Sequence, residues 1–216
     1  MRTAAPPSSM TPHGLLRRRA VAAVLVTAPA LCLNVLAQPQ HQRPTPAQTE
    51  GPFYPVVFPE DSDYDLLHNG ALSYPDGQGA WLEGSVVDLA GQPVAGAQVE
   101  IWQCDHAGHY HHPADSGMAD NRFQGFGKVT VAADGRYRFH TIRPAPYSGR
   151  TPHIHVKVRL GTRELLTTQV YVADDPHNPR DFLWRSLSAA DRAALTVTFA
   201  PGVDGLRAAF PIVVAT

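Results

Sequence analysis

HIHVKVRL, residues 153–160, is the stretch of sequence that decides the fold. Apolar and polar residues alternate strictly along it, a pattern typical of a β-strand with one face in a core. The apolar positions are Ile154, Val156, Val158 and Leu160. The opposite face begins with His153 and His155, so this strand predicts both a core and a pair of neighbouring imidazoles.

Similar short segments separated by turn formers surround this strand. Residues 128–142, KVTVAADGRYRFHTI, predict a β-hairpin that turns at Asp134 and Gly135. One short helix is expected over residues 188–195, with Ser188 as its N-cap. Further strands are expected at residues 81–89, 97–105, 164–172, 196–201 and 210–214. Short strands without a βαβ rhythm predict an all-β, antiparallel sandwich or barrel.

Composition narrows the class of protein. The 216 residues are enough for one well-cored domain, and 20 prolines with 17 glycines indicate many turns. The formal net charge of −1 offers no electrostatic basis for binding nucleic acid, so we expect no nucleic-acid partner.

The first 37 residues have the composition of an export signal. They contain four arginines and no acidic residue, followed by an apolar stretch from Ala20 to Ala37. We expect export by the general secretory or the twin-arginine route, followed by cleavage after Ala37. The alternative is an uncleaved membrane anchor. The predicted location is periplasmic or extracellular, without stable membrane association after cleavage.

The remaining chain is divided into two parts. The polar, proline-rich residues 38–48 predict a flexible linker or extended arm, and residues 49–216 predict the folded domain. Removal of the leader leaves 14 basic against 19 acidic residues, a net charge of −5. Cys104 is then the single cysteine, so no intrachain disulfide can form, and we expect it to be a small buried apolar residue.

Two histidines spaced i and i+2 on a strand can share one metal ion. A carboxylate would suit ferrous iron and a third nitrogen would suit zinc; the nearest carboxylates are Glu164 and Asp174. The neighbouring loops instead offer the phenols of Tyr110 and Tyr147. Tyrosinate is a hard anionic ligand, and its charge favours ferric iron.

A set of motifs resembles the intradiol ring-cleavage dioxygenases, which include the catechol 1,2-, hydroxyquinol 1,2- and protocatechuate 3,4-dioxygenases. The motifs occur in the family's order and cover most of the predicted domain. They are TEGPFYP (49–55), GxVxDxxGxPVxGAxVEIWQ (84–103), DxxGxY (105–110), TIRPxxY (141–147), RxPHIH (150–155) and TTQVY (167–171).

The resemblance implies an Ig-like β-sandwich that holds non-haem Fe(III) and cleaves a catechol-type substrate with O2 between its hydroxylated carbons, giving a muconate-type dicarboxylic acid. The implied metal ligands are Tyr110, Tyr147, His153 and His155, with Tyr147 as the ligand that leaves when substrate binds. Implied substrate contacts are Arg150, Gln169 and the backbone of Gly51 and Pro52. A homo-oligomer is also expected.

Two features qualify these expectations. The loop between Tyr147 and His153 is shorter than in typical members of the family, so the pocket wall should be cut back. Residues 88–102 also resemble transthyretin-like and carboxypeptidase-regulatory-like domains, which leaves a secreted binding module without catalysis as the alternative.

We expect Trp102 in the core or pocket floor. We expect solvated positions at the rim of the site for His106, His109, His111 and His112.

Overall fold

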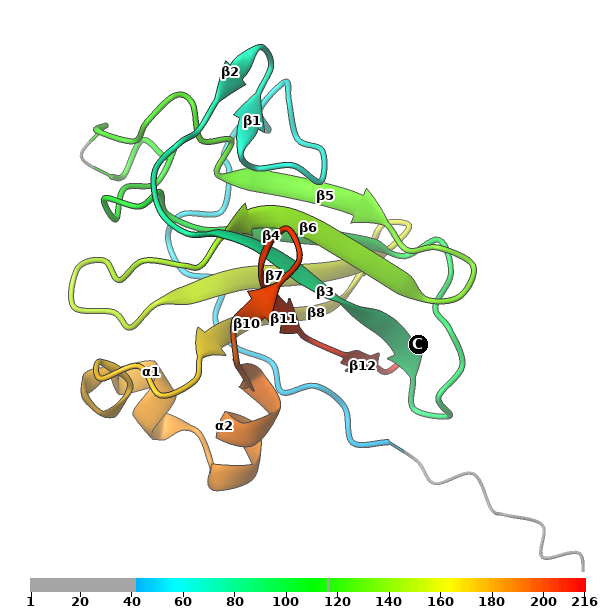
Figure 1. Cartoon of the computed structure of the whole chain (residues 1–216). Helices are drawn as coiled ribbons and strands as arrows, with labels where there is room; N and C mark the ends of the chain where they lie inside the picture. Colours follow the sequence, from blue (N-terminus) through cyan, green and yellow to red (C-terminus); the bar gives the residue numbers. More distant parts are fainter. Residues whose placement is uncertain (1–41, 116) are drawn as a thin grey trace, which may run out of the picture. The chain divides into compact units, whose positions relative to one another are not determined.

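The computed structural model describes residues 42–115 and 117–216 (Figure 1). The predicted export signal, residues 1–37, and the first part of the predicted linker, residues 38–41, lie outside the described residues. No helix among the residues that are described has the length and apolar character needed to cross a membrane.

Two five-stranded sheets and one small hairpin form the domain (Figure 1). The first sheet contains β3 (Gly79–Asp88), β6 (Arg136–Ile142), β10 (Ala200–Gly202), β11 (Gly205–Ala209) and β12 (Ile212–Val214). The second sheet contains β4 (Gln98–Trp102), β5 (Phe126–Thr130), β7 (His153–Leu160), β8 (Arg163–Val172) and β9 (Thr196–Val197). The hairpin consists of β1 (His68–Asn69) and β2 (Leu72–Ser73).

The core lies between these two sheets, which confirms the predicted all-β sandwich. Ile154, Val156 and Val158 of β7 are fully buried and belong to one apolar cluster with Leu82 of β3 and Phe139 of β6. Most strand pairs are antiparallel, but β3 pairs in parallel with β11 and β12, and β8 pairs in parallel with β9.

The core face of β7 ends at Val158, two residues before the end of the strand. The register with β8 shifts between Val158 and Arg159, which is the mark of a β-bulge. Leu160 is consequently 40% exposed, although the sequence pattern placed it on the core face.

The predicted hairpin over residues 128–142 is wrong. β5 pairs with β4 and β6 pairs with β3, so Asp134 and Gly135 lie where the chain crosses from one sheet to the other. The Ala132 N–H donates to the Arg136 carbonyl and closes this turn. A hairpin and a crossing strand pair both bury alternate residues, and the two cannot be told apart by alternation alone.

The described part of the predicted linker is a fixed extended arm. Residues 42–48 donate backbone hydrogen bonds to Leu89, Val213 and Thr167, and the Thr168 hydroxyl donates to the Pro46 carbonyl. These bonds connect the arm to both sheets, so residues 42–48 follow the extended-arm alternative and not the flexible linker.

The helices lie at the end of β8 (Figure 1). α2 (Ala189–Leu195) is the predicted helix, and the Ser188 hydroxyl accepts from the Asp191 N–H as its N-cap. A 3-10 turn, η1 (Asn178–Arg180), and a five-residue helix, α1 (Phe182–Ser186), precede it. The Asp181 carboxylate caps α1, accepting from the N–H groups of Leu183 and Trp184.

Candidate metal centre

The two strand histidines face each other inside the domain. His153 and His155 are each 1% exposed, and their Nε2 atoms lie 3.2 Å apart. They share one face of β7, as the sequence predicted, and their ring centroids are 4.8 Å apart. Two imidazole nitrogens are therefore directed at one enclosed point.

Both imidazoles are held in the neutral form. His153 Nδ1 lies 2.6 Å from the Thr151 carbonyl, which can only accept, so Nδ1 carries the proton and Nε2 presents a lone pair. Burial and the Arg150 guanidinium lower the pKa of His153 to about 4. Burial, followed by His153 and Arg150, lowers the pKa of His155 well below its usual value. Neutral imidazole is the form that binds metals.

A two-residue turn brings Tyr147 to the histidines. Ser148 and Gly149 both have positive φ, +42° and +76°, and the Arg150 N–H donates to the Tyr147 carbonyl at 2.7 Å. Two positive φ angles are the signature of a type I′ turn, which suits the short loop noted in the sequence. The turn places the Tyr147 ring 5.4 Å from the His153 ring, measured between centroids.

Tyr110 enters from the loop after β4. Asp105 braces that loop by accepting the N–H groups of Ala107 and His109, and Asp115 accepts the Tyr110 N–H at 2.6 Å. The Tyr110 side chain is 3% exposed, and its enclosed hydroxyl has no hydrogen-bond partner among the described residues. Burial raises the pKa of Tyr110 well above its usual value.

The side-chain rings of the four predicted ligands form a closed circuit, in which each ring lies next to two of the others. Tyr110 lies 4.9 Å from Tyr147 and 6.2 Å from His155 between centroids, and the remaining two sides are the Tyr147–His153 and His153–His155 pairs given above. The structure therefore brings together all four residues named from sequence, although they come from three separate segments of chain.

Arg150 lies beside this circuit and is held at two points. Its Nε donates to Asp181 Oδ2 and its Nη2 donates to Gln169 Oε1, each at 2.7 Å. Gln169 is fully buried on β8 directly opposite His155 of β7. The ion pair with Asp181 keeps a positive charge next to the rings, and that carboxylate also accepts the Thr151 N–H.

The segment from residue 49 covers the outer side of the rings. Gly51 has φ +74°, and a Cβ there would lie 3.2 Å from His155 Cε1, so glycine permits this close approach. Pro52 is exposed. Phe53 stacks on Tyr110 at 4.5 Å between centroids and meets Tyr147 edge-on at 5.7 Å.

Trp102 is the floor beneath His155. The two residues are cross-strand partners on β4 and β7, and their rings stack 4.8 Å apart at an interplanar angle of 10°. His155 Nδ1 has no hydrogen-bond partner among the described residues, so this stacking orients its ring. The buried position predicted for Trp102 is confirmed, as is that of Cys104.

The carboxylates considered from sequence do not join the rings. Glu164 accepts from the Thr167 hydroxyl and pairs with Lys157, and Asp174 is exposed. Across residues 42–115 and 117–216, no group of three or more His, Cys, Asp or Glu side chains is arranged to hold a metal. A donor set at this point must therefore include the tyrosines.

The conspicuous histidines of residues 106–112 lie around the outside. His106 and His111 are exposed, and His111 Nε2 contacts the carbonyls of Asp120 and Phe123 and so braces the loop. His112 is half-buried and meets the edge of Phe53, with centroids 5.7 Å apart.

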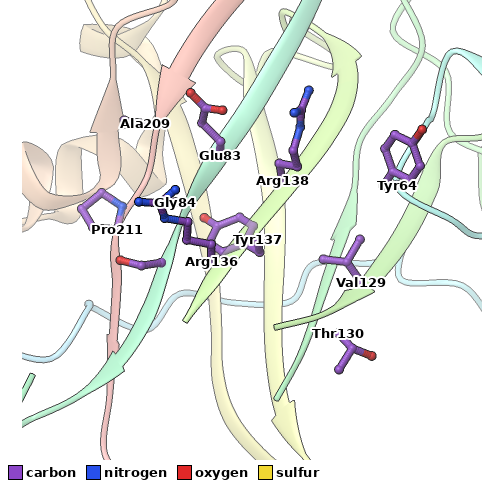
Figure 2. Close-up of a pocket in the computed structure, with 11 residues that line it drawn as sticks. Tyr64, Glu83, Gly84, Val129, Thr130, Arg136, Tyr137, Arg138, Ala209 and Pro211 are labelled. Atoms are coloured by element: carbon purple, nitrogen blue, oxygen red, sulfur yellow. The ribbon is translucent and has the colours of Figure 1, made fainter. Parts of the chain in front are cut away.

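Two hollows differ in their relation to the rings. A hollow of about 830 Å³ lies on β3, β5, β6 and β11 and contains none of the predicted site residues (Figure 2). A smaller one of about 160 Å³ is lined by Tyr110, Phe53 and Trp102. The smaller hollow is therefore the better candidate for the substrate pocket, because it borders the rings and the larger one does not.

Sequence reasoning missed Phe53 and Asp181. Phe53 lies inside a motif that was identified, TEGPFYP, but only the two residues before it were assigned to the pocket. Asp181 lies outside every motif, and its one local signal is its place before α1, where an N-cap is expected. Its contact with Arg150, 31 residues away, is visible only in three dimensions.

Comparison with known proteins identifies the family of the chain. The model of a family described as Dioxygenase matches residues 49–215, which include all four rings, Arg150 and Gln169. The chain belongs to the intradiol dioxygenase family. The protocatechuate 3,4-dioxygenase beta chain of Burkholderia cepacia is 35% identical over 163 residues, covering 68% of each chain.

Other intradiol dioxygenases show the same likeness. The hydroxyquinol 1,2-dioxygenase of Corynebacterium glutamicum is 33% identical over 154 residues, covering 63% of this chain and 48% of that protein. Among solved structures, the dioxygenase domain of a dioxygenase carbohydrate-binding protein fusion from Streptomyces sp. SirexAA-E has a TM-score of 0.65 and 30% identity. That match covers 81% of this chain and 99% of the domain. This chain spans about half the length of the first curated relatives it matches.

Proposed function

We propose that this chain is a non-haem, Fe(III)-dependent intradiol dioxygenase that cleaves a catechol-type ring with O2 between its two hydroxylated carbons. The observation that carries the proposal is the closed circuit of two neutral imidazoles and two phenols, with a partly buried guanidinium beside it. Relatives named for catechol, hydroxyquinol and protocatechuate support a catecholic substrate class.

The residues at the circuit fit a ferric ion. His153 Nε2 presents a lone pair, and the enclosed Tyr110 hydroxyl is without a hydrogen-bond partner among the described residues. A buried polar atom without a partner costs free energy, and a bound cation would relieve that cost. Two tyrosinates supply the negative charge that a trivalent cation requires. Tyr110, Tyr147, His153 and His155 would hold the ion.

When bound, the ferric ion would act as a Lewis acid that draws electron density from a catecholate and makes its ring reactive toward O2. The chain supplies the rest of the chemistry. Tyr147 is half-buried on the tight turn that it forms with Arg150. As a tyrosinate, it would be the group best placed to accept, at its Oη, a proton from an incoming catechol hydroxyl.

Arg150 would stabilise negative charge that develops on the substrate ring. Its guanidinium is fixed by Asp181 and Gln169 before substrate arrives, so little reorganisation is needed at the moment of reaction. Phe53 and Trp102 surround the rings with apolar surface, which excludes water and strengthens these electrostatic interactions.

Two measurements test the function. Iron-loaded protein should show the red-brown charge-transfer absorption of ferric tyrosinate, and a colourless loaded protein would reject the donor set. A panel of catechols should include one that consumes one O2 per ring and yields a muconate-type diacid by mass spectrometry. Extradiol products would contradict the proposed reaction.

We also propose that the chain is exported, on the basis of the leader at residues 1–37. Cell fractionation should find the protein outside the cytoplasm, with Gln38 as its first residue by mass spectrometry. Recovery of the uncleaved chain from the membrane fraction would favour the anchor instead.

A further inference from the structure

The arm at residues 42–48 is anchored to both sheets before it reaches the rings. Thr45 donates its N–H to the Val213 carbonyl at 2.9 Å and accepts the Val213 N–H with its hydroxyl at 2.8 Å. Gln48 donates its N–H to the Thr167 carbonyl of β8 at 2.9 Å. The family match begins at residue 49, so the arm precedes the part of the chain that the family model describes.

The inner end of the arm hydrogen-bonds to a buried tyrosine. Gln48 Oε1 accepts from the Tyr171 hydroxyl at 2.7 Å. Tyr171 is fully buried, and its Oη also lies 3.2 Å from Oε1 of Gln169. A phenol has one proton to donate, so the shorter bond to Gln48 directs that proton away from Gln169.

The Gln169 side chain in turn fixes Arg150. Its Oε1 accepts from Arg150 Nη2 at 2.7 Å, and its Nε2 donates to the Thr49 carbonyl at 2.9 Å. The two ends of this amide are therefore held by the last residue of the arm and by the residue that follows it. Thr49 holds one end directly, and Gln48 governs the other through Tyr171.

We propose that Gln48 is a positioning residue for the candidate site. Its side-chain carbonyl engages the Tyr171 hydroxyl, which leaves Gln169 Oε1 to Arg150 and so orients the guanidinium beside the rings. Loss of that carbonyl would turn the Tyr171 proton fully toward Gln169 Oε1, and an oxygen shared between two donors would hold Arg150 Nη2 less tightly. The catalytic consequence rests on the proposed function, but the orientation of Arg150 can be measured without iron or substrate.

Three variants of the full chain separate this role from a general effect on the arm. Gln48→Leu removes the acceptor at nearly constant volume, and Gln48→Glu retains an acceptor oxygen at the same length. Gln42→Leu is the matched control, because it makes the same change on the same arm at an exposed position. Urea unfolding of all three establishes that each is folded.

The first readout is the Arg150 guanidinium itself. Proton exchange at its Nε and Nη positions can be followed by ¹⁵N NMR on iron-free protein, with the signals assigned from Arg150→Lys. We expect Gln48→Leu to speed exchange at Nη about tenfold, roughly the effect of one lost hydrogen bond. Exchange at Nε, which is bonded to Asp181, should change less. Gln48→Glu and Gln42→Leu should resemble the parent.

The second readout is turnover of the iron-loaded protein with a catechol that the parent cleaves. We expect Gln48→Leu to lower kcat about five- to tenfold, with a smaller change in KM, and Gln48→Glu to restore most of the rate. If Gln48→Leu matches Gln42→Leu in both NMR exchange and kcat, the positioning role is wrong. If exchange rises but no catechol is cleaved even by the parent, the proposed function fails and the positioning role stands.

Discussion

At the scale of single residues, the candidate centre depends on a few side chains that their neighbours hold in one orientation. Tyr147 is fixed by a turn of two residues with positive φ, and His153 is fixed by the Thr151 carbonyl. His155 is fixed by stacking on Trp102. Gly51 contributes by lacking a side chain, since a Cβ there would lie 3.2 Å from the His155 ring.

Removal of the Tyr147 hydroxyl tests its two assigned roles. Tyr147→Phe should still bind iron through the other three ligands, with weaker and shifted charge-transfer absorption because one phenolate is lost. Catechol binding, followed by stopped-flow absorbance, should slow at least tenfold because the proposed proton acceptor is missing. Unchanged binding kinetics would count against the role of Tyr147.

A methyl group at Gly51 should disturb His155 specifically. Gly51→Ala places a Cβ against that ring, whereas Gly161→Ala has a similar positive φ, +60°, with nothing within 4 Å. Both variants should lose about 1 kcal/mol or more of unfolding free energy for the strained backbone. Only Gly51→Ala should also weaken iron binding, measured by competition with a chelator. Equal iron affinity of the two variants would show that the close approach is unimportant.

At the scale of elements, neighbouring strands and loops place the site residues. β4, β7 and β8 set Trp102, His155 and Gln169 side by side in one sheet, so three residues distant in sequence become cross-strand neighbours. The helix α1 contributes through its N-cap, because the Asp181 carboxylate binds the helix with one oxygen and Arg150 with the other.

Two N-caps of the same chain therefore make a matched experiment. Ser188→Ala removes the cap of α2 and should cost about 1 kcal/mol of unfolding free energy, with turnover unchanged. Asp181→Ala removes the cap of α1 and also leaves the partly buried Arg150 without its ion-pair partner, so we expect a loss of about 3 kcal/mol. Its kcat should fall at least tenfold as Arg150 loses orientation. If both variants lost stability and activity alike, Asp181 would be a helix cap only.

At the scale of the whole molecule, iron and fold should stabilise one another. The proposed ligands come from three segments of chain, and a ligand that binds only the folded state raises its stability by mass action. Removal of iron with a chelator should lower Tm by several degrees and abolish the charge-transfer colour, and Fe(III) should restore both. A His155→Ala variant is the control and should show little change in Tm on chelation. A Tm of the parent that is indifferent to iron would argue against a site built from all three segments.

Prediction from sequence succeeded where the residues that specify a feature all lie within one short segment. The HIH strand and the capping serine of α2 are each complete within about eight residues, and both were confirmed. The residues proposed as ligands and substrate contacts also came from short motifs, and the structure brings the four rings together. The crossing at Asp134 and Gly135 was missed because alternation shows which face is buried but not which strand is the partner.

The sequence by itself determined the all-β class, the apolar face of β7 and the two tyrosines and two histidines that converge. These follow from side-chain periodicity and from motifs, which are local properties of the chain. Only the tertiary structure decided that Asp181 and Gln169 hold Arg150, that Phe53 covers Tyr110, and that residues 42–48 form an anchored arm. Each of those contacts joins residues 19 to more than 100 positions apart, and side-chain periodicity within a segment does not report which distant residue a side chain will meet.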